Sequence, residues 1–244
     1  MKIRSLFLSA ALAASGVQAA GITVSAAASL SDAFKQIVQA YGQAYPGDKV
    51  KLNTAASGVL LRQLEQGAPV DVLATADAAT MDKADQKQLI DRETRKNFAR
   101  NALVLAVPKN AAVSIRHSGD LNRVRRIAIG KPESVPAGAY AKAALEKQGL
   151  FDVLRPKFVY TQNVRQALDY VVRGEVDAGL VYRTDAQLKQ FAVKTAYVVP
   201  TEAVLYPVAV TRSSAQPAAA RRFAGFVQSP EAQRILQSYG FSRP

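Results

Sequence analysis

The stretch ITVSAAASLSDAFKQIVQAY, residues 22–41, contains the first strand and the first helix of the predicted fold. It opens with the β-branched residues Ile22 to Val24, which favour a strand. After the alanines at 26–28, apolar residues recur at spacings of three and four, as on the buried face of a helix. These residues are Leu30, Ala33, Phe34, Ile37, Val38 and Tyr41. Ser29 or Ser31 is predicted to cap the start of this helix.

The alternation of strand and helix continues along the chain in both composition and spacing. Further strands are expected at 49–54, 70–74, 101–108, 127–129, 157–160, 176–182, 197–199 and 207–210. Helices are expected after 57, at 80–89, at 137–148, after Thr161 as the cap, and from the Ser229 cap to Gly240. This order predicts an α/β fold whose mostly parallel sheets are flanked by helices.

Small and hydroxyl residues recur where a predicted strand leads into a helix. Examples are Ala28-Ser29, Ala56-Ser57-Gly58 and Pro136-Ala137-Gly138. Ligands of open α/β sheets bind at the carboxyl ends of the strands. A helix that begins there offers unpaired backbone N–H groups and a partial positive charge. Several such helix starts in one place would bind an anion without a lysine.

The composition excludes several classes of function. The 244 residues include no Cys and one His, His117, so disulfides, thiolate zinc sites and iron–sulfur clusters are excluded. His117 is expected in a surface loop. Lys and Arg number 32 against 19 Asp and Glu, a formal net charge of +13. The basic residues form no block and no basic–aromatic array, so we expect a solvated basic surface and no nucleic-acid partner.

Residues 1–19 have the pattern of a signal peptide. Lys2 and Arg4 precede the apolar run 6–14, and Val17-Gln18-Ala19 resembles a cleavage site. No run of 18 or more apolar residues follows. The mature chain is therefore expected to begin near Ala20 and to be exported. Without a cysteine for lipid attachment, a soluble periplasmic protein is the expected product.

Six stretches together resemble the periplasmic molybdate-binding proteins of molybdate ABC transporters. They are ITVSAAASLSDAF (22–34), ASGVLLRQLEQGAPVDVLATAD (56–77), PESVPAGAYAKAAL (132–145), NVRQALDYVVRGEVDAGLVYRTDA (163–186), YPVAV (206–210) and SPEAQRILQSYGF (229–241). The resemblance implies a type II periplasmic-binding-protein fold with two lobes and the ligand in the cleft between them. We expect a discontinuous first lobe, 20–104 plus 207–244, and a second lobe, 105–206.

The resemblance also implies which residues bind the ligand. They are the hydroxyls of Ser29, Ser57 and Tyr182, and the backbone N–H groups of Ala137 and Val164. A dianion that carries no proton has acceptors only, so a set of donors suits it. Read without the resemblance, Ser29 and Ser57 are ordinary helix caps, Ala137 and Val164 are first-turn residues, and Tyr182 is an aromatic at the rim.

Four positions in or beside these motifs need separate expectations. Asn163 and Lys131 stand where the family pattern suggests acidic residues, and Lys131 could attract anions at the mouth of the cleft. Arg165 and Arg183 flank the motifs, and we expect them in salt bridges or in solvent.

The predicted function is capture of molybdate, and also of tungstate, for an ABC transporter permease in the inner membrane. The protein is expected to be a monomer without a cofactor or a free metal cation. The alternative is another small anion, such as sulfate or a carboxylate; a carboxylate would favour an arginine clamp, for which Arg62 or Arg165 is available. An enzyme is disfavoured because no GxSxG motif is present. A transcription regulator is disfavoured by the export signal and the missing helix-turn-helix.

Overall fold

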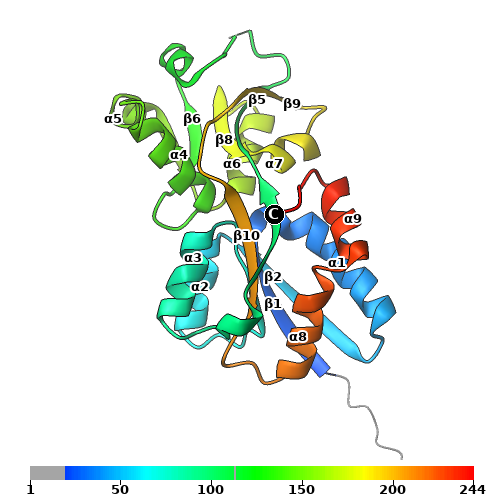
Figure 1. Ribbon diagram of the computed structural model, residues 1–244. Coiled ribbons are helices and arrows are strands. Elements are labelled where there is room, and N and C mark those ends of the chain that lie inside the picture. The colour runs from blue at the N-terminus through cyan, green and yellow to red at the C-terminus, as the bar shows by residue number, and fades with distance from the viewer. Residues whose placement is uncertain (1–19, 113) are drawn as a thin grey trace, which may run out of the picture.

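The computed structural model describes residues 20–112 and 114–244; the predicted signal peptide, residues 1–19, lies outside the described residues. The described strands form two five-stranded sheets, and each sheet with its helices makes one lobe (Figure 1). The first lobe carries the sheet β2-β1-β3-β10-β4 and the second lobe carries β7-β6-β8-β5-β9.

The strands of the first sheet are β1 (Ala20–Ala27), β2 (Asp48–Ala55), β3 (Val72–Ala74), β4 (Lys96–Asn101) and β10 (Val204–Val210). Those of the second sheet are β5 (Leu103–Pro108), β6 (Ile127–Gly130), β7 (Phe158–Thr161), β8 (Ala178–Tyr182) and β9 (Val193–Val198). The α-helices are α1 (Ser31–Ala44), α2 (Ser57–Glu65), α3 (Ala78–Gln86), α4 (Pro136–Glu146), α5 (Phe151–Leu154), α6 (Val164–Val172), α7 (Arg183–Leu188), α8 (Pro217–Phe226) and α9 (Pro230–Ser238). Short 3₁₀ turns are η1 (Ala28–Leu30), η2 (Arg92–Thr94), η3 (Ser118–Arg123) and η4 (Arg155–Lys157).

Each sheet is mixed, with one strand reversed. β2 and β3 run parallel to β1, whereas β10 is antiparallel to both of its neighbours, β3 and β4. In the second sheet, β7 and β8 run parallel to β6, and β5 is antiparallel to β8 and β9. The reversed strands β5 and β10 are the ones that the chain enters on crossing from one sheet to the other. Their reversal follows from the crossing, because the chain enters each new sheet from the ends of the strands that face the other lobe.

The predicted strand 101–108 is two strands. β4 ends at Asn101 in the first sheet, and β5 begins at Leu103 in the second sheet. Ala102 lies between them, and its N–H donates to Oδ1 of Asn101 at 2.9 Å. A hydrophobic run alone does not reveal that its residues pair with different sheets.

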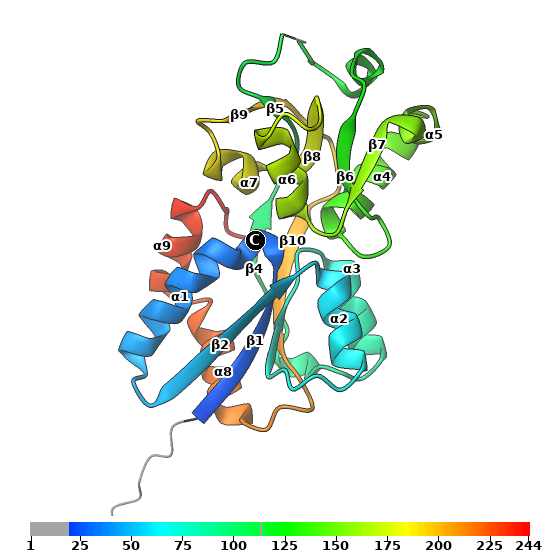
Figure 2. The same cartoon turned by 180° about the vertical axis from the view of Figure 1, so that it is seen from behind.

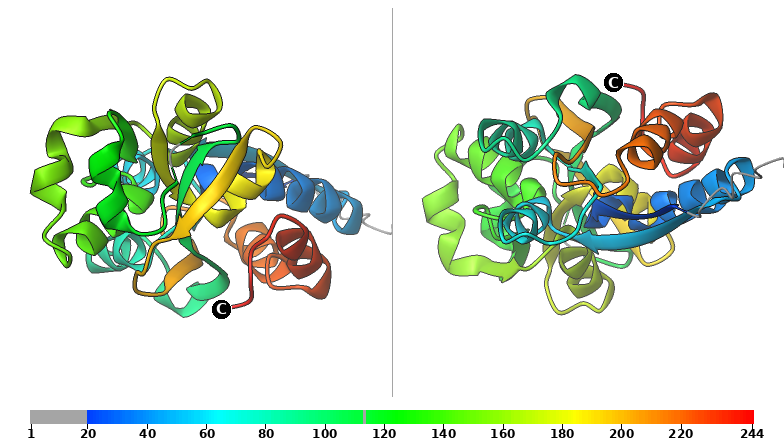
Figure 3. Two further views of the ribbon diagram at one scale, coloured as in Figure 1. Left: turned by 90° about the horizontal axis from the view of Figure 1, so that it is seen from above. Right: turned by 90° about the horizontal axis from the view of Figure 1, so that it is seen from below.

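Helices cover both faces of each sheet. In the first lobe, α1, α8 and α9 lie on one side and α2 and α3 on the other, and Figure 2 shows the same arrangement from behind. In the second lobe, α4 and α6 cover opposite faces of β6 and β8. The views along the vertical axis show the layers of the two lobes (Figure 3).

The predicted apolar face of α1 is confirmed, but its predicted cap is wrong. Ala33, Phe34, Ile37 and Tyr41 are buried. The turn η1 separates β1 from α1, so Leu30 is the capping residue and makes no side-chain hydrogen bond. The Ser31 hydroxyl lies within the helix and donates to the carbonyl of Ala28 at 2.7 Å.

The cap of α6 also differs from the prediction, whereas that of α9 agrees with it. Asn163, and not Thr161, accepts from an N–H of the first turn of α6, that of Gln166, at 3.0 Å. Ser229 caps α9, as predicted, by accepting from Ala232 N. Among the described residues, no helix is long and apolar enough to cross a membrane.

Candidate functional site

The five residues implied by the sequence resemblance lie around one small cavity between the lobes. Ser29 follows β1 and Ser57 follows β2 in the first lobe, while the second lobe contributes Ala137, Val164 and Tyr182. The cavity has a volume of about 10 Å³. This is far smaller than the roughly 300–1,000 Å³ of pockets for drug-sized ligands, so the site suits only a ligand of a few atoms.

The other residues that line the cavity carry no charge. They are Ala27, Ala28, Ala56, Ala76, Val135 and Pro136. A carboxylate is therefore absent from this lining among the described residues. The cavity presents hydroxyl groups, backbone amides and small apolar side chains.

The two serines are buried and neither acts as an ordinary helix cap. The Ser57 hydroxyl accepts from the N–H of Ala76 at 3.0 Å. This bond occupies a lone pair and leaves the hydroxyl hydrogen to be donated. The Ser29 hydroxyl lies 3.1 Å from the hydroxyl of Tyr206. The capping interpretation is wrong for both residues, because α1 and α2 begin without a side-chain cap.

Backbone donors come from three helix starts. Ser57 and Val164 are the first residues of α2 and α6, and Ala137 is the second residue of α4, after Pro136. The first N–H groups of an α-helix have no partner within the helix, and the helix dipole adds partial positive charge there. The starts of α2, α4 and α6 all border the cavity, so a bound anion meets positive dipole ends from both lobes.

Tyr182 reaches across the cleft from the end of β8. Its hydroxyl donates to the carbonyl of Ala76, in the first lobe, at 3.2 Å. Burial raises the pKa of Tyr182 well above its usual value, so the hydroxyl keeps its proton near neutral pH. This single hydrogen is engaged by Ala76, so Tyr182 donates to a ligand only in exchange for that bond.

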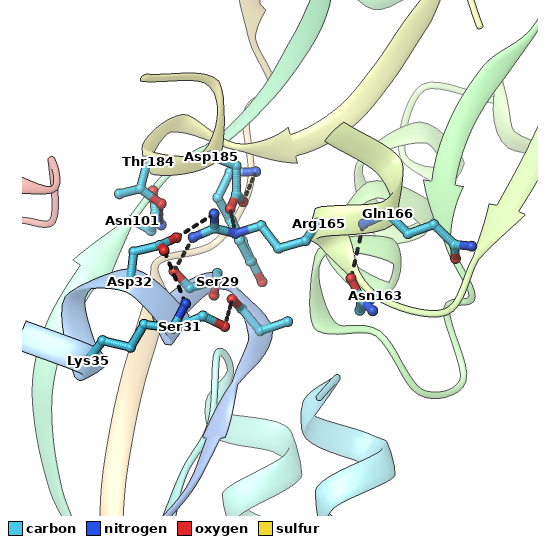
Figure 4. Close-up of polar contacts among 12 residues, drawn as sticks. Ser29, Ser31, Asp32, Lys35, Asn101, Asn163, Arg165, Gln166, Thr184 and Asp185 are labelled. Atoms are coloured by element: carbon cyan, nitrogen blue, oxygen red, sulfur yellow. Dashed lines mark hydrogen bonds and ion pairs between the residues drawn. The ribbon is translucent and has the colours of Figure 1, made fainter. Parts of the chain in front are cut away.

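Arg165 lies beside the site but its charge is balanced by two aspartates (Figure 4). Its Nη1 is 2.8 Å from the Asp32 carboxylate and its Nη2 donates to the carbonyl of Ser29 at 3.2 Å. Its Nε is 2.8 Å from Oδ1 of Asp185, a charge contact whose angle is not that of a hydrogen bond. The predicted salt bridge of Arg165 is confirmed, and Arg183 is exposed.

Asp185 is fully buried, and this sets its protonation. Burial raises its pKa to about 6, and the Arg165 guanidinium and the N–H of Tyr182 oppose the shift. The N–H of Tyr182 donates to Oδ2 of Asp185 at 3.2 Å. Asp185 thus fixes the start of α7 and the backbone of Tyr182, and does not enter the cavity lining.

A larger groove of about 820 Å³ lies next to the cavity and shares Val135 and Pro136 with it. It runs between α2 and α3 of the first lobe and α4 of the second. Arg62 lines this groove and not the cavity. Lys131 is exposed and lines neither space.

The lobes touch at three places near the cavity. The N–H of Gly58 in α2 donates to the carbonyl of Ser134 at 3.1 Å, beside the groove. Arg165 of α6 holds Asp32 of α1, and neither residue lines the groove. These contacts, with the bond from Tyr182 to Ala76, hold the two lobes together.

Sequence reasoning missed two residues behind Ser29, one buried and one half-buried. Tyr206 is on β10 and Asn101 is at the end of β4, and Asn101 Nδ2 donates to the Tyr206 hydroxyl at 3.2 Å. The motif YPVAV contained Tyr206, but nothing local in it indicated contact with a residue 177 positions away. Within the described part of the chain, no three His, Cys, Asp or Glu residues cluster as a metal site would require. His117 lies near Asp120 with an exposed side chain, as predicted.

Comparison with known proteins places this chain in a family. The model of the family described as bacterial extracellular solute-binding protein matches residues 22–242. The molybdate-binding protein ModA of Escherichia coli K12 is 39% identical over 231 residues, which cover 91% of this chain and 88% of that protein. The molybdate-binding protein ModA of Haemophilus influenzae is 36% identical over 249 residues, covering 99% of this chain and 97% of that protein.

A solved structure agrees with the fold. The periplasmic molybdate-binding protein of Azotobacter vinelandii superposes with a TM-score of 0.81 at 24% identity, covering 91% of this chain and 99% of that chain. The predicted type II periplasmic-binding-protein fold is confirmed, with sheets that are mixed. The family consists of binding proteins and not of enzymes. The chain belongs to the bacterial extracellular solute-binding protein family, and its relatives within that family include the molybdate-binding proteins.

Proposed function

We propose that this protein binds molybdate in the periplasm and delivers it to the permease of an ABC transporter in the inner membrane. The observation that carries the proposal is a small uncharged cavity surrounded by donors from both lobes. Two serine hydroxyls, a tyrosine hydroxyl and three helix starts border it. The names of the Escherichia coli and Haemophilus influenzae relatives support molybdate as the ligand.

Chemical complementarity supports a proton-free tetrahedral dianion. Molybdate at neutral pH only accepts hydrogen bonds, and hydroxyl and amide donors match it. A carboxylate ligand fits less well, because Arg62 and Arg165 do not line the cavity. Tungstate has the same charge and shape as molybdate and is proposed as a second ligand.

Sulfate is the second candidate, because it is also a dianion without a proton at neutral pH. Charge does not distinguish it from molybdate. Size does, because donors fixed on two lobes reach the oxygens of the larger anion and leave stretched bonds to the smaller one.

The proposed cycle involves closure of two lobes, predicted as 20–104 plus 207–244 and 105–206, around the ligand by hinge motion. In the fold described above, the second sheet already includes Leu103 and the first sheet resumes at Val204, so the proposed crossings lie two or three residues earlier. The mature monomer is proposed to begin near Ala20, after removal of residues 1–19. Cleavage is tested by N-terminal sequencing of protein recovered from the periplasm, and the oligomeric state by light scattering.

The binding experiment is calorimetry on the purified, ligand-stripped protein with molybdate, tungstate, sulfate and phosphate. We expect molybdate and tungstate to bind at least a hundredfold more tightly than sulfate, since poor geometry at one or two charged hydrogen bonds costs roughly 1.5–3 kcal/mol each. Equal or tighter binding of sulfate would refute the assignment of molybdate.

A further inference from the structure

Three side chains, two of them buried and that of Asn101 half-buried, form a chain of hydrogen bonds that ends at the cavity. Asn101 Nδ2 lies 3.2 Å from the Tyr206 hydroxyl, which lies 3.1 Å from the Ser29 hydroxyl. Tyr206 is fully buried, and Ser29 almost so. Burial raises the pKa of Tyr206 well above its usual value, so its hydroxyl stays protonated.

The direction of these bonds follows from the backbone. The N–H of Ala102, which can only donate, faces the Asn101 side chain at 2.9 Å, and the atom that faces it is therefore Oδ1. This places Nδ2, which can only donate, toward Tyr206 and toward the Thr184 hydroxyl at 2.9 Å. Figure 4 shows Asn101 next to Thr184. The oxygen of Tyr206 thus accepts from Asn101.

Tyr206 has one hydroxyl hydrogen, and the Ser29 oxygen is the acceptor beside it. When Tyr206 donates to Ser29, one lone pair of Ser29 is occupied and its own hydrogen is left to be donated into the cavity. Ser57 is held in the same state by a different donor, the N–H of Ala76.

We propose that Asn101 and Tyr206 are positioning residues that hold the Ser29 hydroxyl as a hydrogen-bond donor and thereby discriminate against protonated oxyanions. The proposal rests on the proposed function, since it concerns the same anion cavity. Phosphate near neutral pH carries at least one hydroxyl, and that hydroxyl needs an acceptor. With one lone pair of each serine engaged from behind, each hydroxyl directs its hydrogen into the cavity and has only one lone pair left to accept from phosphate. Molybdate and sulfate need no acceptor and are not penalised.

The test is a double-mutant cycle of Tyr206→Phe and Ser29→Ala, with calorimetry for molybdate and for phosphate at pH 8. Tyr206→Phe removes one hydroxyl and keeps the ring. We expect it to weaken molybdate about threefold to tenfold, the range for one neutral hydrogen bond. Phosphate should lose less or gain, because both lone pairs of Ser29 are then free to accept from its hydroxyl, so the ratio of the two affinities falls by about threefold or more. In the Ser29→Ala background, Tyr206→Phe should change neither affinity by more than about twofold.

Two further variants separate positioning from folding. Asn101→Ala removes the first donor of the chain and should lower the affinity ratio in the same direction. Tyr41→Phe removes a hydroxyl from another buried tyrosine, whose partner is Asp48, and should leave the ratio unchanged. Melting curves monitored by circular dichroism identify variants that lose structure. If Tyr206→Phe is one of them, the ratio of molybdate to phosphate affinity is measured in Asn101→Ala instead.

The outcomes distinguish this inference from the proposed function. An unchanged ratio in Tyr206→Phe, or an equal effect of Tyr206→Phe with and without Ser29, would overturn the positioning role even if molybdate binds tightly. If the wild-type protein prefers sulfate, molybdate capture fails, and the cycle with sulfate in place of molybdate still decides the role of Tyr206. Preference of the wild-type protein for phosphate would overturn both.

Discussion

Replacement of Gly58 by alanine should weaken ligand binding without weakening the fold. Gly58 is the second residue of α2 in the first lobe, and a Cβ atom there would lie 2.8 Å from both Cα and the carbonyl oxygen of Ser134 in the second lobe. Contact with backbone atoms at this distance is relieved only by movement of one segment from the other. Separation to an ordinary 3.4 Å requires about 0.6 Å of movement.

The size of the effect follows from what that movement disrupts. It weakens the 3.1 Å bond between the N–H of Gly58 and the Ser134 carbonyl, worth about 0.5–1.5 kcal/mol. It also widens a cavity whose donors come from both lobes. A total loss of about 1–2 kcal/mol corresponds to roughly fivefold to thirtyfold weaker binding.

The stability of the ligand-free protein should change in the opposite direction. Alanine is favoured over glycine within a helix by up to about 1 kcal/mol, and the lobes are able to separate when no ligand holds them together. Calorimetry with molybdate and thermal melting of the ligand-free protein measure the two effects. Gly42→Ala is the matched control: Gly42 lies in α1, and nothing within 4 Å would meet its Cβ. It should raise stability and leave affinity unchanged.

Wild-type affinity in Gly58→Ala would refute the inference that the lobes must approach this closely for binding. A loss of affinity that parallels a loss of ligand-free stability would also refute it, because that pattern indicates damage to α2 and not obstruction of closure.

Three other predictions follow from the site. Ser29→Ala and Tyr182→Phe should each weaken molybdate binding about tenfold to a hundredfold, the range for one hydrogen bond to a charged group. Arg165→Ala should weaken binding less. If calorimetry ranks Arg165→Ala as the most damaging of the three, the proposed donor set is contradicted. Molybdate at 100 times its dissociation constant should stabilise the protein by about 2.7 kcal/mol and raise Tm by roughly 5–10 °C, and an unchanged melting curve would argue against binding. Because the pKa of Asp185 is about 6 in the folded protein and 3.8 is its ordinary value, the folded state holds a proton that the unfolded state has lost between these pH values. Stability from this group therefore falls as pH rises from about 4 to 6, and Asp185→Asn should remove that decline in urea titrations across the window; an identical pH profile in the variant would refute the assignment.

Local patterns in the sequence predicted the features that local interactions determine. The apolar spacing of α1 gave its buried face, because helix geometry alone brings Ala33, Phe34, Ile37 and Tyr41 to one side. The gathering of Ser29, Ser57, Ala137 and Val164 was also predictable in kind. Each follows a strand of a parallel set, and the carboxyl ends of such strands meet at one edge of a sheet.

The features that were missed, including the partners of Ser29 and of Arg165, depend on contacts between distant segments. Ser29 and Tyr206 are 177 positions apart, and Arg165 and Asp32 are 133 apart. The pairing of β10 within the first sheet brings Tyr206 behind Ser29, and the approach of the two lobes brings Arg165 to Asp32. The predicted serine cap failed for a local reason that propensity does not reveal: η1 shifts the helix start past Ser29.

A neutral lining on a basic protein has a consequence for selectivity. The chain carries a formal charge of +13, yet Arg165, which follows the cavity-lining residue Val164, is matched by Asp32 and Asp185 and does not line the cavity. A guanidinium in the lining would attract sulfate, phosphate and molybdate alike, because the interaction of a point charge depends on charge and distance and little on shape. Fixed hydroxyl and amide donors depend on the positions of the oxygens and on whether each oxygen carries a proton. Balancing Arg165 with two aspartates thus keeps its hold on the Ser29 backbone and leaves discrimination between anions to the geometry of the donors.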